Sequence, residues 1–296
     1  MSSSEQQPSK LRLASAEPAD EIAQRHEREK RAAFLQREED LSNSLAPFRV
    51  GSVPYLNAVP LTRGLEEQVL FIPPSALAEK LRRSELDAAL VSVTEVLFND
   101  CYDVLDGIAV ASLGEVKSVF LAHRRPLEEA KEIFCDTASL ASVHLLRVLL
   151  AERGLRTEFK PLASYDASRL PDFALLIGDP ALDFLLGPHE HQIWDLGAAW
   201  FEMTKSPFVY AVWALRRGIE NERLRRLLRE AKDFGMDTLD FIIGNRTEYD
   251  YAFRKDYLSW HIHFHFGADE RRGLAKFIEL LRKHGLGPVF EPRFVW

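Results

Sequence analysis

The chain has 296 residues, of which 46% are hydrophobic and 28% are charged, and its formal net charge is −7. These proportions are ordinary for a globular protein with a sizeable core, and the acidic balance argues against nucleic acid or an anionic membrane as a partner. The two cysteines, Cys101 and Cys135, give no disulfide framework. No apolar run approaches the ~18 residues of a membrane span. The N-terminus also has no apolar signal-peptide core, so we expect a cytoplasmic protein.

Residues 1–47 differ in composition from the rest of the chain. They mix acidic and basic side chains, contain one aromatic residue, Phe34, and have no glycine. Such a segment has little apolar surface to bury, which favours a solvated segment without a core of its own. We predict a charged N-terminal extension that is partly helical or disordered.

From Phe48 onward, strand-like runs alternate with helical patterns. The first helical pattern begins at Ser75, and the residue types in the runs favour buried strands. This alternation predicts an α/β protein with a largely parallel sheet. The expected strands of this first unit are 49–53, 68–72, 87–93, 108–113 and 118–124.

A second α/β unit follows. A helix should begin near Ser139 and end at Gly154, a residue type that often follows a helix C-terminus. Strands are expected at 172–179 and 207–217, and residues 219–285 have helical patterns almost throughout.

Two such units predict a two-lobed protein with its ligand between the lobes, at the ends of strands. The expected first lobe combines residues 48–121 with 218–296, and the second lobe spans 122–217.

Several common catalytic motifs are missing from the sequence. Neither the glycine-rich loop GxGxxG nor the phosphate loop GxxxxGK[ST] is present, and the GxSxG nucleophile motif is absent too. These absences argue against a Rossmann dehydrogenase, a P-loop enzyme and an α/β-hydrolase.

The segment HIHFHF, residues 261–266, is the strongest candidate for metal binding. Its three histidines would share one face of a strand, and imidazole is a common metal ligand. However, the surrounding pattern is helical, and neither a carboxylate nor a cysteine completes an obvious site. We therefore predict no metal site.

Polar side chains cluster in the loops that follow the predicted strands. Tyr55 and Asn57 come directly after the first strand, where they could face a ligand, pack in the core or bond to local backbone. Ser139 and Ser142 lie at the start of a helix, a position that suits either simple capping or an anion site. Ser112 and Ser118 flank a turn that contains Gly114.

Taken together, five segments resemble, in order, the chorismate dehydratases of the futalosine route to menaquinone (the MqnA family). The resemblance covers roughly residues 48–290, and residues 1–47 lie outside it. Its segments are GSVPYLNAVPL, LDAALVSVTE, GIAVASLGEVKSVFL, LLIGDPAL and DLGAAWFEMTKSPFVYAVW.

The resemblance implies a two-lobed periplasmic-binding-protein-like type II fold with the active site in the cleft between the lobes. The implied reaction is the removal of water from chorismate, a dianion, to give 3-[(1-carboxyvinyl)oxy]benzoate, with neither a metal nor an organic cofactor. Asn57 and Ser118 are the implied catalytic pair. No side chain in these loops is an obvious base, and the substrate's own side-chain carboxylate is one candidate proton acceptor. The implied substrate-binding residues are Ser52, Tyr55, Ser92, Ser112, Ser139, Ser142 and Asp179.

Three features depart from the family pattern: the long N-terminus, Ala141 in place of a hydroxyl residue, and the sequence Thr204-Lys205-Ser206-Pro207 in place of the usual Thr-Gly-Leu-Pro. Alternatives to a dehydratase are a non-catalytic binding protein or sensor for an aromatic or cyclic carboxylate, and the sister enzyme dihydroxynaphthoate synthase, which shares the fold. A third alternative is an α/β protein with an unrelated aromatic-acid ligand. The sequence does not determine the oligomeric state.

Overall fold

The computed structural model describes residues 19–42, 44–136 and 139–296. Its first element is the charged helix α1 (Ala19–Leu41), and the first 18 residues of the predicted extension lie outside the described residues. Residues 41–296 form a separate unit, which holds the two sheets described below.

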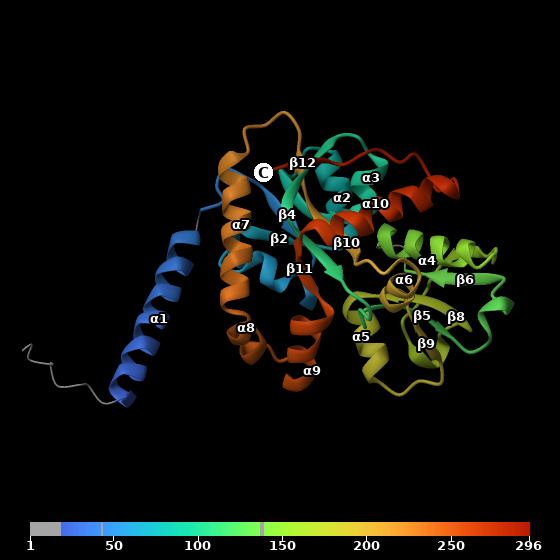
Figure 1. The fold of residues 1–296 in the computed structure, drawn as a ribbon, viewed down its shortest axis with the longest axis horizontal. Coiled ribbons are helices and arrows are strands. Elements are labelled where there is room, and N and C mark those ends of the chain that lie inside the picture. Colours follow the sequence, from blue (N-terminus) through green and yellow to red (C-terminus); the bar gives the residue numbers. More distant parts are fainter. Residues whose placement is uncertain (1–18, 43, 137–138) are drawn as a thin grey trace, which may run out of the picture. The chain divides into compact units, whose positions relative to one another are not determined.

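The first sheet brings together strands from both ends of this unit (Figure 1). Its order is β11-β4-β10-β3-β1-β2, and β12 pairs with one end of β4. β1 is parallel to β2 and β3, whereas β10 is antiparallel to β3 and β4. The sheet is therefore mixed and not largely parallel as predicted. Its strands are β1 (Val50–Ser52), β2 (Val69–Phe71), β3 (Ala88–Ser92), β4 (Tyr102–Ser112), β10 (Phe208–Arg216), β11 (His263–Phe266) and β12 (Arg293–Val295).

The second sheet is built from the middle of the chain, in the order β7-β6-β8-β5-β9. Part of its core is a cluster around Phe120, Leu176 and Phe184, which joins β5 and β8 to helix α5. Its strands are β5 (Val119–His123), β6 (Glu132–Cys135), β7 (Glu158–Pro161), β8 (Phe173–Ile177) and β9 (Gln192–Asp195), and its helices are α4 (Leu140–Glu152), α5 (Gly178–Leu186) and α6 (Leu196–Thr204).

The chain crosses between the sheets at two places. It leaves the first sheet after Ser112 and enters the second at Val119, and it returns between Thr204 and Phe208. The predicted second lobe included residues 207–217, but the hydrogen bonds of β10 place that strand in the first sheet. An apolar run marks a strand without saying which neighbours it will pair with, so only the tertiary structure decides this point.

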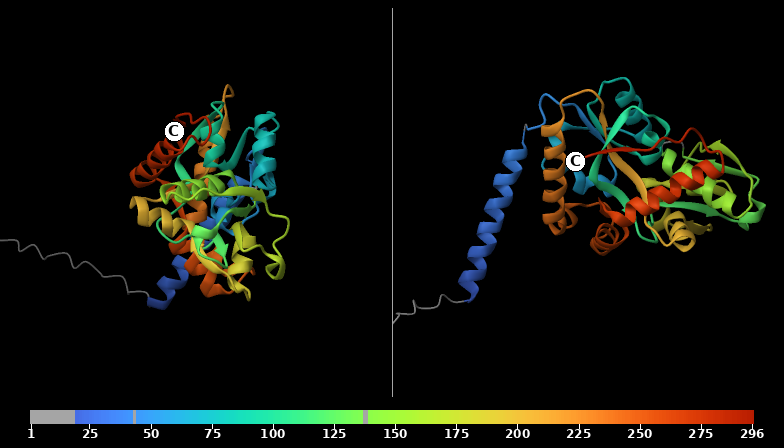
Figure 2. Two further views of the ribbon diagram at one scale, coloured as in Figure 1. Left: turned by 90° about the vertical axis from the view of Figure 1, so that its right-hand side faces the viewer. Right: turned by 45° about the horizontal axis from the view of Figure 1, so that its top comes forward.

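The remaining helices flank the first sheet, and the last of them also contacts helix α4 of the second lobe. Figure 2 shows the end of α10 beside α4, where Lys283 and His284 both contact Glu152. None of the helices in the described residues is long and apolar enough to cross a membrane. These helices are α2 (Pro74–Arg82), α3 (Val93–Phe98), α7 (Glu222–Asp237), α8 (Leu239–Asn245), α9 (Tyr251–Asp256) and α10 (Ala268–Lys283).

The segment between α9 and α10 differs from its predicted helical pattern. Residues Tyr257–His261 form a single π-helical turn, and His263–Phe266 form strand β11, which pairs with β4. The prediction of helix over the HIHFHF segment was therefore wrong. β11 pairs with residues 107–111 of β4, so hydrogen bonding to a strand edge outweighed the local helical pattern.

Helix α7 packs closely on the 3₁₀ helix Leu56–Thr62, which contains Asn57. Pro60 lies inside this helix. A Cβ atom at Gly235 of α7 would lie 1.9 Å from the carbonyl oxygen of Pro60. Only glycine permits this approach, and the approach fixes the segment that carries Asn57.

Gly235→Ala is therefore expected to lower the free energy of unfolding by about 3 kcal/mol, because overpacking costs about 1–3 kcal/mol and here the obstructing atom belongs to the backbone. Gly244→Ala is the matched control: it also replaces a helical glycine, but its Cβ would meet nothing within 4 Å. The control should gain up to about 1 kcal/mol from helix propensity. Urea unfolding measures both variants, and equal effects would contradict the packing argument.

Candidate active site

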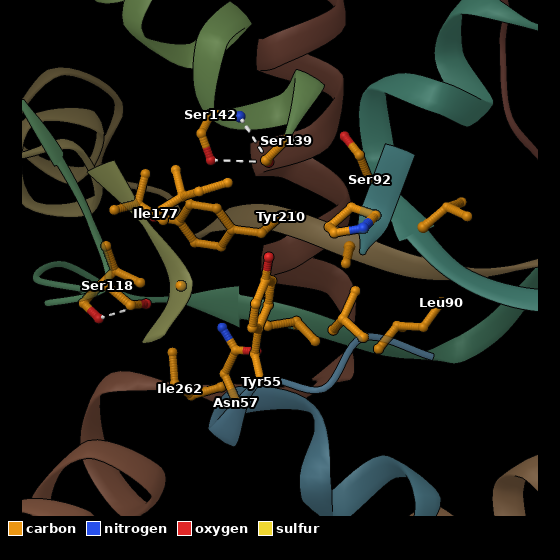
Figure 3. Close-up of a pocket in the computed structure, with 18 residues that line it drawn as sticks. Tyr55, Asn57, Leu90, Ser92, Ser118, Ser139, Ser142, Ile177, Tyr210 and Ile262 are labelled. Atoms are coloured by element: carbon orange, nitrogen blue, oxygen red, sulfur yellow. Dashed lines mark hydrogen bonds between the residues drawn. The ribbon is translucent and has the colours of Figure 1, made fainter. Parts of the chain in front are cut away.

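A pocket lies between the two sheets, at the ends of strands from both (Figure 3). None of its described lining residues carries a charge, and its polar groups are hydroxyls and one amide. Such a site can recognise an anion only through neutral donors, backbone N–H groups and helix dipoles. The lining residues are Val53, Tyr55, Asn57, Pro74, Leu90, Val91, Ser92, Val110, Val116, Ser118, Val119, Ser139, Ser142, Ile177, Gly178, Tyr210, Ala211 and Ile262.

The structure brings six of the nine predicted site residues into this lining. They come from the loop after β1, the end of β3, the start of β5 and the start of α4, so four chain segments converge on one cavity. The six are Tyr55, Asn57, Ser92, Ser118, Ser139 and Ser142. The other three, Ser52, Ser112 and Asp179, lie outside the lining.

The three residues outside the lining lie directly behind it. Ser52 is fully buried in β1. The hydroxyl of Ser112 lies 3.2 Å from the hydroxyl of Tyr210, and it also bonds to the carbonyl of Gly114. Ser112 therefore orients Tyr210, a lining residue that the sequence analysis did not single out.

Asp179 connects the second sheet to the Tyr55 loop of the first. Its Oδ1 accepts a hydrogen bond of 3.1 Å from the backbone N–H of Leu56. The adjacent Gly178 has a φ of +64°, and a Cβ there would lie 3.2 Å from the Tyr55 ring. Glycine thus allows both the left-handed backbone and the close packing of the ring. Burial raises the pKa of Tyr55 to about 12, helped by Asp136 and Asp179, so its hydroxyl is protonated at neutral pH.

Burial raises the pKa of Asp179 to about 6, so folding disfavours its carboxylate form. A carboxyl group with a raised folded-state pKa binds more protons when folded, and stability therefore falls as the pH rises from about 4 to about 6. Asp179→Asn keeps an acceptor for Leu56 and removes this penalty. After discounting for partial exposure, we expect a gain of about 1–2 kcal/mol at pH 7 and little gain at pH 4. Urea unfolding at the two pH values is the measurement, and a gain of equal size at both would contradict it.

Three hydroxyl groups meet at the start of α4, two from the helix itself and one from the other sheet. Ser139 caps the helix as predicted: its Oγ accepts from the N–H of Ser142 and lies 3.1 Å from the Ser142 hydroxyl. From the other sheet, the Ser92 hydroxyl accepts a 2.8 Å hydrogen bond from the N–H of Ala141. Ala141 has no side-chain hydroxyl, but its backbone N–H donates to Ser92 across the cleft.

Ser118 belongs to a buried hydroxyl network that the sequence analysis missed. The hydroxyl of Tyr257 donates to Ser118 Oγ over 2.7 Å, and both residues are fully buried. Burial raises the pKa of Tyr257, while hydrogen bonds to Ser118 and Asn57 lower it. Tyr257 therefore joins the two residues of the predicted catalytic pair. It lies about 140 positions after Ser118 in a π-helical turn, and no local spacing in the sequence indicates this contact.

The turn before Ser118 is held by Asp195 at the end of β9. The Asp195 carboxylate accepts hydrogen bonds from the N–H groups of Val116 and Lys117, and it also caps α6 through Ala198. Lys117 in turn contacts Asp256 over 2.6 Å. These bonds hold the loop by which the chain first crosses from one sheet to the other, and they thereby fix the position of Ser118.

Two other segments that the sequence analysis considered lie outside the pocket. Lys205 is exposed, ends α6 in a left-handed conformation and lies above the Phe201 ring, outside the pocket lining. Among the described residues, His263, His265 and Glu270 form a group that could hold a metal ion, and none of them lines the pocket.

A family model described as menaquinone biosynthesis matches residues 48–283. A curated chorismate dehydratase from Thermus thermophilus is 32% identical over 282 residues, which is 84% of this chain and 99% of the relative.

Solved structures at lower identity share the fold. Protein AF1704 from Archaeoglobus fulgidus matches with a TM-score of 0.63 at 18% identity, over 81% of this chain and 98% of that one. The periplasmic aliphatic sulphonate binding protein SsuA from Escherichia coli matches with a TM-score of 0.56 at 13% identity, over 84% and 93% of the two chains. The predicted two-lobed periplasmic-binding-protein-like α/β fold is therefore confirmed.

Proposed function

This chain belongs to the menaquinone-biosynthesis family that includes chorismate dehydratase, and we propose that the pocket between its two sheets is where it removes water from chorismate. The chain is a hydro-lyase acting on chorismate. The product is 3-[(1-carboxyvinyl)oxy]benzoate, and one ring proton and one ring hydroxyl leave together as water. The observation that carries the proposed location is the convergence of Asn57, Ser118 and the start of α4 on one uncharged pocket.

The start of α4 is proposed to bind one carboxylate of the substrate. Ser139 and Ser142 supply hydroxyl donors there, and the positive end of the helix dipole favours an anion. Ser92, which bonds to the N–H of Ala141 in this structure, can exchange that bond for one to the ligand. None of the described lining residues carries a negative charge that would oppose this carboxylate.

Asn57 and Ser118 are proposed as the catalytic pair, and both hydrogen-bond to the buried Tyr257 hydroxyl. The Asn57 amide and the Ser118 hydroxyl would hold the leaving hydroxyl and the reacting carboxylate in position. Positioning of this kind holds the substrate in the conformation from which the reaction proceeds. No described lining residue is a carboxylate, a histidine or a lysine. The substrate's side-chain carboxylate therefore remains the proposed proton acceptor.

Tyr55 is proposed to form one wall for the substrate ring. It projects into the pocket toward the start of α4 (Figure 3), with its own ring packed on Gly178. Asp179 supports it indirectly, through Leu56. We therefore assign Asp179 a positioning role in place of the predicted direct contact with substrate, together with Ser112, which orients Tyr210.

The proposal includes a cytoplasmic location and a small-molecule substrate without a nucleic-acid or membrane partner. Two free cysteines, one of them buried, suit a reducing compartment. No cofactor enters the proposed chemistry.

The test is to mix the purified full-length protein with chorismate in buffer containing a chelator and to follow the products by mass spectrometry. An aromatic product lighter than chorismate by one water is the expected result. Intact chorismate would overturn the proposed activity, and a binding titration would then test the alternative of a binding protein or sensor for a cyclic carboxylate.

A further inference from the structure

Strand β11 and the first turn of α10 bring two imidazoles and a carboxylate together outside the active-site pocket. His263 and His265 are two residues apart on β11, so they share one face of the strand. The chain then turns at Gly267, and Glu270 follows in the first turn of α10. The potential ligand atoms of His263, His265 and Glu270 all lie within 4.8 Å of one another.

The distances suit a small tetrahedral ion. Nε2 of His265 lies 3.3 Å from Oε1 of Glu270. Ligand atoms about 2.1 Å from a tetrahedral zinc ion lie about 3.4 Å from each other, so this pair needs almost no adjustment. The two imidazole rings are stacked, with centroids 5.7 Å apart and planes inclined by 18°. A rotation of the His263 side chain would bring its nitrogen closer to the other two ligand atoms.

The carboxylate of Glu270 is held in place. Glu270 is only 2% exposed, and its Oε2 accepts a 2.8 Å hydrogen bond from the N–H of Gly267. This leaves Oε1 directed at His265. Ligating carboxylates in metal sites are typically oriented by such a second hydrogen bond. A buried carboxylate also needs a cation or strong donors close by, and the described group next to Oε1 is the His265 imidazole.

We propose that His263, His265 and Glu270 form a binding site for a divalent transition-metal ion, with Zn²⁺ the best match. Two imidazole nitrogens and one carboxylate oxygen suit Zn²⁺, whereas Mg²⁺ and Ca²⁺ require mainly oxygen ligands. Three protein ligands leave a fourth position for water. Because His265 is largely exposed, the ion can reach the site from solvent.

The ion would act on structure and not on the dehydration itself. It would hold β11 to the start of α10. β11 follows the pocket residue Ile262, which in turn follows the π-helical turn that begins at Tyr257. This inference departs from the prediction of no metal site. That prediction assumed a helix over 261–266 and no nearby carboxylate, whereas the structure has a strand there and Glu270 beside it.

The test is calorimetric titration of the chelator-treated, dialysed full-length protein with ZnSO₄, and a parallel titration with CoCl₂ followed by visible absorption. One equivalent of Zn²⁺ should bind, and bound Co²⁺ should show the intense d–d bands of a four-coordinate site. His263→Gln and His265→Gln should each weaken Zn²⁺ binding by about 100-fold or more, since even loss of an outer-shell partner costs about 10- to 100-fold.

His284→Gln is the matched control. His284 also pairs with a glutamate, Glu152, but it does not belong to the group of His263, His265 and Glu270. The control should bind Zn²⁺ like the unchanged protein. Absence of stoichiometric binding, or equal losses in the control and the two ligand variants, would show that His265 and Glu270 form an ion pair only. Neither readout uses chorismate, so this outcome is independent of the dehydratase assay.

Discussion

Replacing Asn57 with alanine is expected to lower kcat for chorismate dehydration by a factor on the order of 10² to 10³ and to leave KM almost unchanged. The Asn57 side chain projects into the pocket (Figure 3) and lies beside the Tyr257 hydroxyl, within the proposed catalytic pair. A donor that acts mainly on the departing hydroxyl stabilises the transition state more than the bound substrate, so its loss appears in kcat. Steady-state kinetics on the purified variant measures both constants.

Asn245→Ala provides the matched control for this variant. Asn245 also offers a side-chain amide, but it bonds to the carbonyl of Phe241 at the exposed end of α8. Its kinetics should equal those of the unchanged protein. An Asn57→Ala variant with normal kcat and a raised KM would show that Asn57 only binds the substrate, and normal values of both constants would remove it from the site.

Replacing Tyr257 with phenylalanine is expected to lower kcat by a factor on the order of 10², although Tyr257 itself does not line the pocket. Its hydroxyl is the donor that orients Ser118 Oγ, at 2.7 Å. The Ser118 hydroxyl also donates to the carbonyl of Val116 over 3.4 Å. Without the Tyr257 donor, only this longer bond orients it. The phenylalanine ring keeps the stacking contact with Phe253, so the fold should survive.

Tyr102→Phe separates this positioning role from a general loss of stability. Tyr102 is also a buried tyrosine, and its hydroxyl donates to Glu95 over 2.9 Å. Both variants should lose about 1 kcal/mol or more of unfolding free energy from a broken buried hydrogen bond. Only Tyr257→Phe should lose kcat. In addition, combining Tyr257→Phe with Ser118→Ala should cost little more than Ser118→Ala alone. Additive losses would show that Tyr257 does not act through Ser118.

The sequence was a good guide to the individual elements. Strands β1, β2, β3, β5, β8 and β10 all lie within their predicted ranges, and α4 begins with the predicted cap at Ser139. Burial patterns and capping residues are local properties, so they can be read along the chain. The site residues were accessible for a related reason, since the six that line the pocket lie beside or at the ends of such strands or at the start of α4.

What the sequence alone determined, then, is the set of elements, the absence of common catalytic motifs and, through five ordered segments, the family. Only the tertiary structure decided that β10 pairs in the first sheet, that HIHFHF forms a strand beside Glu270, and that Tyr257 reaches Ser118. Each of these features depends on a contact between residues that are far apart in sequence: the pairings of β10 and β11 and the Tyr257–Ser118 bond each span more than 100 positions. Local propensity and periodicity extend over one turn or one strand, whereas such contacts are selected by the packing of the whole core.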